Sequence, residues 1–231
     1  ASLRGILVVN APDGNIITTA EHTVALLFAL ARKIPAAVRS VMEGHWERSK
    51  FVGSELSSKV LGVIGLGRVG STVARLAGNL GMNVVAYDPF ISAEAAEKRG
   101  VKPVSLDELL VQSDYISLHV PKTTETAGLI GAEEIARMRS GACIVNCARG
   151  GLLDEEAAAA ALDSGQLAGV ALDVYAVEPP GAESALVGRD DVICTPHLGA
   201  STKEAQENVA VSVAEQVVAY LTTGGVKNAV N

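Results

Sequence analysis

The sequence predicts a doubly wound α/β fold, in which helices cover both faces of a parallel sheet. From Lys59 onward, short β-branched segments alternate with helical ones, the pattern of right-handed crossovers between parallel strands. Apolar residues make up 48% of the 231 residues but aromatic residues only 3%, so the core must consist of Val, Ile, Leu and Ala. Such an aliphatic core is typical of strands that are buried on both faces.

The predicted strands are short, rich in β-branched residues and bounded by turns. The first, Ile6–Val9, is aliphatic and ends at a turn rich in Asn, Pro and Gly over residues 10–14. The others are Val60–Ile64, Asn83–Tyr87, Tyr115–Leu118, Ala142–Asn146, Ala168–Leu172 and Val192–Cys194.

Two longer helices flank this pattern. Thr18 and Glu21 have capping-box spacing and predict a helix to about Lys33, and Pro35 then marks a break with more helix behind it. A polar stretch over residues 46–58 is predicted to be a loop. A second capping box, Ser201-x-x-Glu204, predicts a terminal helix to about Leu221. Shorter helices are predicted at Val69–Leu80, Ser92–Lys98, Leu106–Gln112, Glu133–Met138 and Asp154–Leu162.

Composition excludes several classes of protein. The net charge is −7 with no basic run, so nothing favours nucleic-acid binding. The longest apolar run, Val24–Ala31, is too short to span a bilayer. The three cysteines, Cys143, Cys147 and Cys194, are odd in number and lie mostly in strand-like segments, which predicts buried thiols and no zinc site. We therefore expect a reducing compartment such as the cytoplasm. An organelle stays open, because the chain begins in mid-fold.

The strand–helix junction at residues 65–70 carries a dinucleotide-binding fingerprint. Gly65 permits the tight turn, Gly67 lets the backbone approach a pyrophosphate, and Gly70 lets the helix pack closely on the strand. Asp88 ends the next strand, where an acid binds the adenosine ribose and repels a 2′-phosphate. The alternative for Asp88 is a turn residue, and Arg68 is either a phosphate ligand or a solvated side chain. The pattern predicts a Rossmann fold that binds NAD.

Three side chains suit the oxidation of a 2-hydroxy acid, and each follows a predicted strand. Arg149 can hold a carboxylate bidentately, His197 can exchange a proton near neutral pH, and Glu178 can favour the imidazolium form. Taken alone, each residue would be read as a turn, loop or structural residue. Because ligands bind at the carboxyl ends of parallel strands, we expect the three to converge beside the cofactor.

The other histidines are weaker candidates. His22 lies within a predicted amphipathic helix and His45 in a polar loop, so both are predicted to be structural. His119 ends a strand and either lines the cofactor groove or packs in the interior.

Several segments together resemble the D-isomer-specific 2-hydroxyacid dehydrogenases over essentially the whole chain. They are NAPDGN at 10–15, GLGRVG at 65–70, LHVPKTTETAGLI at 118–130, NCARGG at 146–151, EPP at 178–180, HLGASTKEAQ at 197–206 and NAVN at 228–231. The resemblance implies that His197 is the acid/base, Glu178 its partner and Arg149 the substrate anchor. It further implies that Asp173 bonds the nicotinamide carboxamide. The implied cofactor residues are Gly65, Gly67, Arg68, Val69, Gly70, Asp88, Cys147, Ala148, Arg149, Asp173, His197, Gly199 and Ala200.

Within that family, HLGASTKEAQ and NAVN point to the branch that oxidises 3-phosphoglycerate to 3-phosphohydroxypyruvate, the first step of L-serine synthesis. One alternative is a glyoxylate/hydroxypyruvate reductase or another member of the family. A second, from a different class, is a non-catalytic NAD-sensing protein of the corepressor kind. The sequence leaves all three open.

The resemblance also implies a domain division and a partner. Residues 10–196 would form the dinucleotide-binding domain, and residues 1–9 and 197–231 would be the linking helix and remnants of a discontinuous substrate domain. The chain would then lack the N-terminal part of that domain. The helix from Thr18 to Lys33 and the loop after it would form the interface of a homodimer or a larger homo-oligomer.

Overall fold

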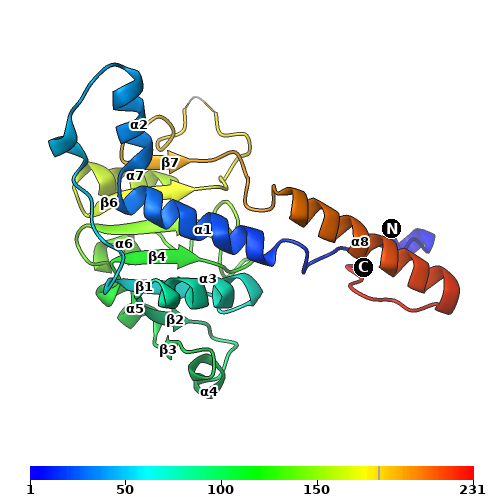
Figure 1. Ribbon diagram of the computed structural model, residues 1–231. Helices are drawn as coiled ribbons and strands as arrows, with labels where there is room; N and C mark the ends of the chain where they lie inside the picture. The colour runs from blue at the N-terminus through cyan, green and yellow to red at the C-terminus, as the bar shows by residue number, and fades with distance from the viewer. Residues whose placement is uncertain (182) are drawn as a thin grey trace.

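The computed structural model describes residues 1–181 and 183–231, and in this part of the chain seven strands form one parallel sheet (Figure 1). The strand order is β3-β2-β1-β4-β5-β6-β7. The strands are β1 (Val60–Ile64), β2 (Asn83–Tyr87), β3 (Lys102–Pro103), β4 (Tyr115–Leu118), β5 (Ala142–Asn146), β6 (Leu167–Leu172) and β7 (Val192–Cys194). The order reverses between β1 and β4, which opens a crevice at the carboxyl ends of the strands. The predicted doubly wound parallel sheet is therefore confirmed.

Helices cover both faces of this sheet, and adjacent strand residues point to opposite faces. Val63 packs in the apolar cluster with α1 and α3, whereas Ile64 packs in the cluster with α5, α6 and α7. The helices are α1 (Ile16–Ala31), α2 (Ile34–Met42), α3 (Arg68–Asn79), α4 (Ala93–Glu97), α5 (Leu106–Gln112), α6 (Ala132–Arg137), α7 (Glu155–Asp163) and α8 (Lys203–Thr223). Two short 3-10 helices are η1 (Ser2–Arg4) and η2 (Arg48–Phe51).

Three local predictions were wrong. Ile6–Val9 is not a strand: it lies away from the sheet, and only Val9 forms a bridge, with Ala229. The capping box at Thr18 was misplaced, because α1 already begins at Ile16. At α8 the cap is Thr202 rather than Ser201, since the Thr202 side chain accepts a hydrogen bond from the amide of Ala205.

The remaining local predictions agree with the structure or differ from it only slightly. The break at Pro35 is confirmed, since Pro35 lies in the first turn of α2 and Lys33 before it has a φ of 52°. The predicted loop over residues 46–58 contains η2. β3 was not predicted, because two residues carry no periodic pattern.

The two chain ends lie together beside α8, away from the sheet (Figure 1). Asn231 ties them: its side-chain oxygen accepts from the amide of Val8 at 2.7 Å, and its amide group donates to the carbonyl of Ile6 at 2.9 Å. Gln216 of α8 donates to the carbonyl of Asn10 at 3.1 Å. Residues 10–15 and 197–202 connect this part to the sheet. Within the described residues, we find no helix that is long and apolar enough to cross a membrane.

Candidate active site and cofactor cleft

The glycine turn between β1 and α3 forms a cradle for an anion. Gly65 has a φ of +94°, which side chains disfavour, and a Cβ at Gly70 would lie 1.9 Å from the carbonyl oxygen of Gly65. A Cβ at Gly67 would instead meet no protein atom within 4 Å. The α3 helix begins after Gly67 with no side-chain cap, so its first amides point into this open space. The turn therefore fits the pyrophosphate of a dinucleotide.

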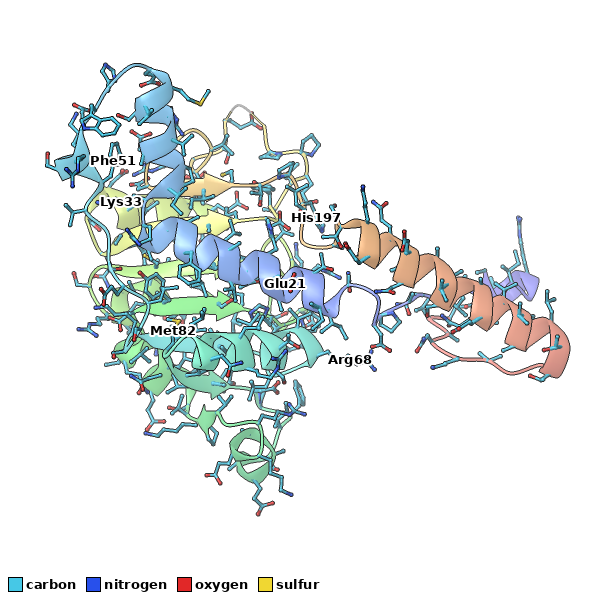
Figure 2. The ribbon with its side chains drawn as sticks, viewed as in Figure 1. Glu21, Lys33, Phe51, Arg68, Met82 and His197 are labelled. Atoms are coloured by element: carbon cyan, nitrogen blue, oxygen red, sulfur yellow. The ribbon has the colours of Figure 1, made fainter. Side chains whose placement is uncertain are left out.

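Asp88 is held beside that turn. One carboxylate oxygen accepts from the amide of Leu66 at 2.8 Å, and the other accepts from the amide of Phe90 at 2.9 Å. The carboxylate is therefore fixed next to the phosphate cradle, where the fingerprint expects the adenosine ribose. Arg68 stands at the start of α3 and forms an ion pair with Asp13 (Figure 2).

Arg99 is a cation at this turn that the sequence patterns did not indicate. Its guanidinium donates to the carbonyl of Leu66 at 2.7 Å and to the Ser71 hydroxyl at 3.2 Å. Arg99 and Leu66 are 33 positions apart, so no local spacing could have shown this contact.

A cleft of about 460 Å³ continues from the glycine turn towards the predicted catalytic residues. It joins Val69 of α3 to the loop after β5, and its remaining walls come from the loop after β4 and from the start of the chain. Its lining residues are Asn10, Ala11, Pro12, Asn15, Thr19, Val69, His119, Val120, Pro121, Cys147, Ala148 and Arg149. His119 thus lines the groove, one of the two possibilities left open for it. Burial lowers the pKa of His119 to about 4, so its imidazole is neutral at physiological pH.

Asn146 at the end of β5 shapes the loop that carries Arg149. Its side-chain amide donates to the carbonyl of Arg149 at 3.0 Å, and its oxygen accepts from the amide of Ala148 at 3.0 Å. The backbone packs so closely here that a Cβ at Gly150 would lie 1.6 Å from the carbonyl oxygen of Tyr175. Arg149 is exposed and lines the cleft, with its guanidinium donating to the carbonyl of Ala148 at 2.6 Å.

Glu178 and His197 form a direct pair. The Nδ1 of His197 lies 2.8 Å from the Oε2 of Glu178, and the other oxygen of Glu178 accepts from the amide of Tyr175 at 3.1 Å. The hydrogen bond from His197 is the main cause that holds the pKa of Glu178 below its usual value, with slight burial opposing it. A carboxylate at Nδ1 fixes the orientation of the ring and leaves Nε2 as the nitrogen for proton exchange.

The loop that carries His197 is anchored by Asp173, which is fully buried. One oxygen of Asp173 accepts from the Thr195 hydroxyl at 2.6 Å and from the amide of Leu198 at 2.7 Å, and the other accepts from the amide of Gly199 at 2.7 Å. Burial would raise the pKa of Asp173, but the hydrogen bonds, that from His22 foremost, outweigh burial and lower it. Asp173 is therefore ionised, and its carboxylate holds the backbone of the loop at Leu198 and Gly199 in place. Its implied contact with the nicotinamide carboxamide stays a prediction.

The three predicted catalytic residues follow three adjacent strands, β5, β6 and β7, and lie at the same edge of the sheet. His197 stands where the chain leaves the sheet for α8 (Figure 2). The structure joins His197 and Glu178 directly, while Arg149 occupies the neighbouring loop along the cleft.

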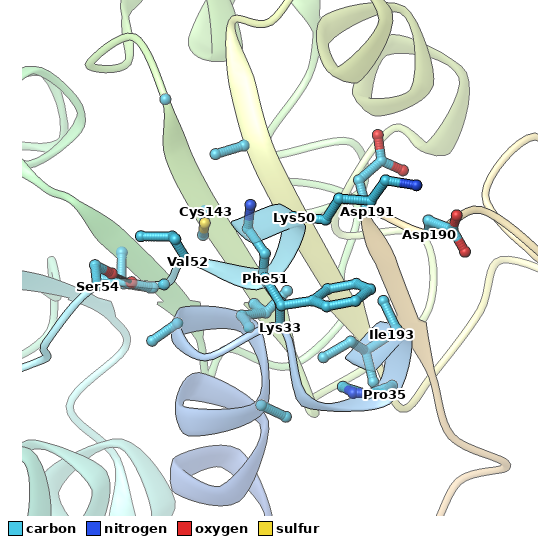
Figure 3. A pocket seen from close by; sticks show the side chains of 18 residues that line it. Lys33, Pro35, Lys50, Phe51, Val52, Ser54, Cys143, Asp190, Asp191 and Ile193 are labelled. Carbon is cyan, nitrogen blue, oxygen red and sulfur yellow. Dashed lines mark hydrogen bonds between the residues drawn. The ribbon is translucent and has the colours of Figure 1, made fainter. Parts of the chain in front are cut away.

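A separate cavity of about 540 Å³ lies at the opposite edge, near the amino ends of the strands (Figure 3). It is lined by the end of α1, the segment 50–54 and the first residues of β4 and β5. No predicted site residue lines it, so we assign no chemistry to it. Among residues 1–181 and 183–231 there is no group of three or more His, Cys, Asp or Glu placed to hold a metal ion.

A parallel sheet with a glycine cradle, an acid after β2 and a His–Glu pair at its carboxyl edge defines an NAD-binding oxidoreductase domain. Comparison with known families agrees. The chain belongs to the D-isomer specific 2-hydroxyacid dehydrogenase family, whose NAD binding domain matches residues 24–199.

Individual relatives are similar over the whole chain. It is 55% identical to a D-3-phosphoglycerate dehydrogenase of Archaeoglobus fulgidus and 54% identical to one of Synechocystis, each over 231 residues. These matches cover 100% of this chain but 44% and 42% of the relatives, so the chain spans less than half the length of the curated relatives it matches.

Solved structures show the same fold. A glyoxylate reductase of Paecilomyes thermophila has a TM-score of 0.91 at 34% identity, covering 100% of this chain and 70% of its own. A D-lactate dehydrogenase of Aquifex aeolicus, complexed with NAD and lactic acid, has a TM-score of 0.86 at 33% identity, covering 99% and 74%. The expected cofactor, NAD, is thereby supported by both family and structure.

Proposed function

We propose that the whole protein oxidises 3-phosphoglycerate to 3-phosphohydroxypyruvate, and that this chain contributes the NAD-binding domain and the acid/base pair. The observation that carries the proposal is the 2.8 Å contact between His197 and Glu178, on loops that follow the two strands next to β5, whose own loop brings Arg149 into the cleft. This reaction is the first step of L-serine synthesis.

Each of the three residues has one task in the oxidation. The Nε2 of His197 takes the proton of the C2 hydroxyl, and the carboxylate of Glu178 stabilises the imidazolium that forms. The guanidinium of Arg149 binds the substrate carboxylate and orients C2. The glycine turn at Gly65, Gly67 and Gly70 would hold NAD⁺, which would supply the acceptor for the hydride that leaves C2.

The choice of a phosphorylated substrate is supported by similarity. Relatives named D-3-phosphoglycerate dehydrogenase are 54–55% identical to this chain, whereas the glyoxylate reductase of known structure is 34% identical. The catalytic pair itself would serve any 2-hydroxy acid, because it acts only at C2.

The test uses the complete gene product with NADH and offers phosphohydroxypyruvate, hydroxypyruvate and glyoxylate separately. We expect a strong preference for phosphohydroxypyruvate, and loss of turnover with retained NADH affinity in the His197→Ala variant. Preference for an unphosphorylated acid would assign the protein to the reductases instead. No turnover on any acid, with NADH-dependent capture of a partner protein, would assign it to the corepressor class.

We also infer a second domain and a second copy of the chain. Residues 1–9 and 197–231 would be the linking helix and remnants of the substrate domain, since Val8 and Ile6 hydrogen-bond to Asn231. The helices α1 and α2 would lie at a homodimer interface, because their outer side is apolar and exposed. The exposed side chains concerned are Phe28, Ile34, Val38, Val41 and Met42.

The three cysteines are free thiols, which fits the expected reducing compartment.

A further inference from the structure

His22 lies on α1, far along the chain from the catalytic residues, yet it contacts the network that holds the His197 loop. Its Nε2 lies 3.2 Å from the Thr195 hydroxyl and 3.3 Å from the nearer oxygen of Asp173. The side chain of His22 is 19% exposed and that of Asp173 is 1% exposed, so water contributes little here. His22 and Thr195 are 173 positions apart.

The acceptors around His22 determine whether its Nε2 carries a hydrogen. The Thr195 hydroxyl has one proton, and at 2.6 Å that proton goes to Asp173, which is ionised. The Thr195 oxygen can then only accept from His22. Both neighbours of the Nε2 of His22 are therefore acceptors, and Nε2 must carry a proton that it shares between them.

The loop needs such support because His197 has a φ of 55°, in the left-handed region that a non-glycine residue adopts at a cost. The amides of Leu198 and Gly199 fix that conformation by donating to Asp173. One turn before His22, the Thr19 hydroxyl lies 3.0 Å from the carbonyl of Gly199 and donates towards it. Thr19 and His22, one turn apart on α1, thus both contact the loop that carries His197.

We propose that His22 is a positioning residue for the reaction: by donating from Nε2 to Thr195 and Asp173, it holds the His197 loop in the geometry that proton transfer requires. The inference rests on the proposed function, because it gives His197 the role of acid/base. Among the described residues, His22 does not line the cofactor cleft and forms no hydrogen bond with His197 or Glu178.

The variants His22→Leu and His22→Gln separate the hydrogen bond from simple packing. Leu fills space without a donor, whereas the side-chain amide of Gln can place a donor near the position of Nε2. In the full-length protein we expect His22→Leu to lower kcat about tenfold, the order of effect for losing a hydrogen bond to a buried carboxylate, with KM and NADH affinity within about twofold. His22→Gln should recover most of the lost kcat. The matched control is His45→Leu, since the side chain of His45 is exposed and, in the described residues, is paired with Glu43 alone.

Two further measurements in the same protein do not depend on turnover. Nitrogen NMR of the unsubstituted protein should show Nε2 of His22 protonated, and hydrogen exchange at Leu198 and Gly199 should be faster in His22→Leu but not in His22→Gln. An unprotonated Nε2 would overturn the inference, even if His22→Leu failed to fold. Equal loss of kcat in both variants would overturn it as well. Absence of turnover in the unsubstituted protein would refute the proposed function alone, because the NMR and exchange results would still decide the role of His22.

Discussion

His197 and Glu178 are 19 positions apart, on loops that follow different strands, and their side chains meet at 2.8 Å. The contact exists because β6 and β7 are neighbours in the sheet and end at the same edge. Glu178 is additionally held by the amide of Tyr175, so the carboxylate is fixed before any substrate arrives.

Replacing Glu178 by Gln should separate orientation from charge. Gln can still bond Nδ1 of His197, but it no longer stabilises the imidazolium. We expect kcat for the oxidation to fall at least about tenfold. Steady-state kinetics of the variant beside the parent protein measure this loss, and an unchanged kcat would show that the charge of Glu178 is unimportant.

Gly67 and Gly70 should respond differently to Ala. At Gly67 the added Cβ meets no protein atom but occupies the open cradle, so we expect a stability change below about 1 kcal/mol and NADH binding at least about tenfold weaker. At Gly70 the Cβ would meet the Gly65 carbonyl at 1.9 Å, so the fold itself should be destabilised. Calorimetric titration and thermal unfolding distinguish the two. Normal NADH affinity in Gly67→Ala would rule out this cradle as the phosphate site.

Gly150→Ala should be among the more damaging substitutions in the loop that carries Arg149. Its Cβ would meet the backbone oxygen of Tyr175 at 1.6 Å, and backbone cannot rotate away as a side chain can. We expect at least about 3 kcal/mol of destabilisation, measured by denaturant unfolding. Gly78→Ala in α3 is the control: its Cβ meets nothing within 4 Å, and it should be neutral or stabilising by about 0.5–1 kcal/mol.

His119 should make stability depend on pH. Its pKa of about 4 in the folded protein lies below the ordinary 6.5, so protons bind the unfolded chain first as the pH falls. Stability that is complete above about pH 6.5 should therefore decline down to about pH 4, by on the order of 2–3 kcal/mol. In His119→Gln this part of the decline should vanish, as followed by urea unfolding at several pH values. His45→Gln, at an exposed site, should behave like the parent.

The sequence was sufficient to predict those features that depend only on neighbouring residues. The glycine fingerprint at 65–70 and the strands β1, β2, β4, β5 and β7 were predicted with their bounds, because each is marked by its own composition and turns. The positions of Arg149, Glu178 and His197 at strand ends followed from the same pattern.

Features that depend on distant contacts were not predictable in this way. His22 was predicted to be structural, since nothing near it in the sequence indicates Thr195 or Asp173. Arg99, which follows α4, reaches the glycine turn across 33 positions of sequence. Ile6–Val9 has the composition of a strand, but the sheet offers it no neighbour, so it forms a single bridge to Ala229.

The chain runs between the sheet and the α8 region twice, at residues 10–15 and 197–202. Near the second connection, the hydroxyls of Thr18 and Thr202 lie 3.3 Å apart, so the two connections are close to each other. Because the region around α8 is attached at two points, it can bend about the line that joins them, whereas rotation about other axes is restricted. Bending of this kind would change the width of the cofactor cleft, because Asn10, Ala11 and Pro12 of the first connection line it.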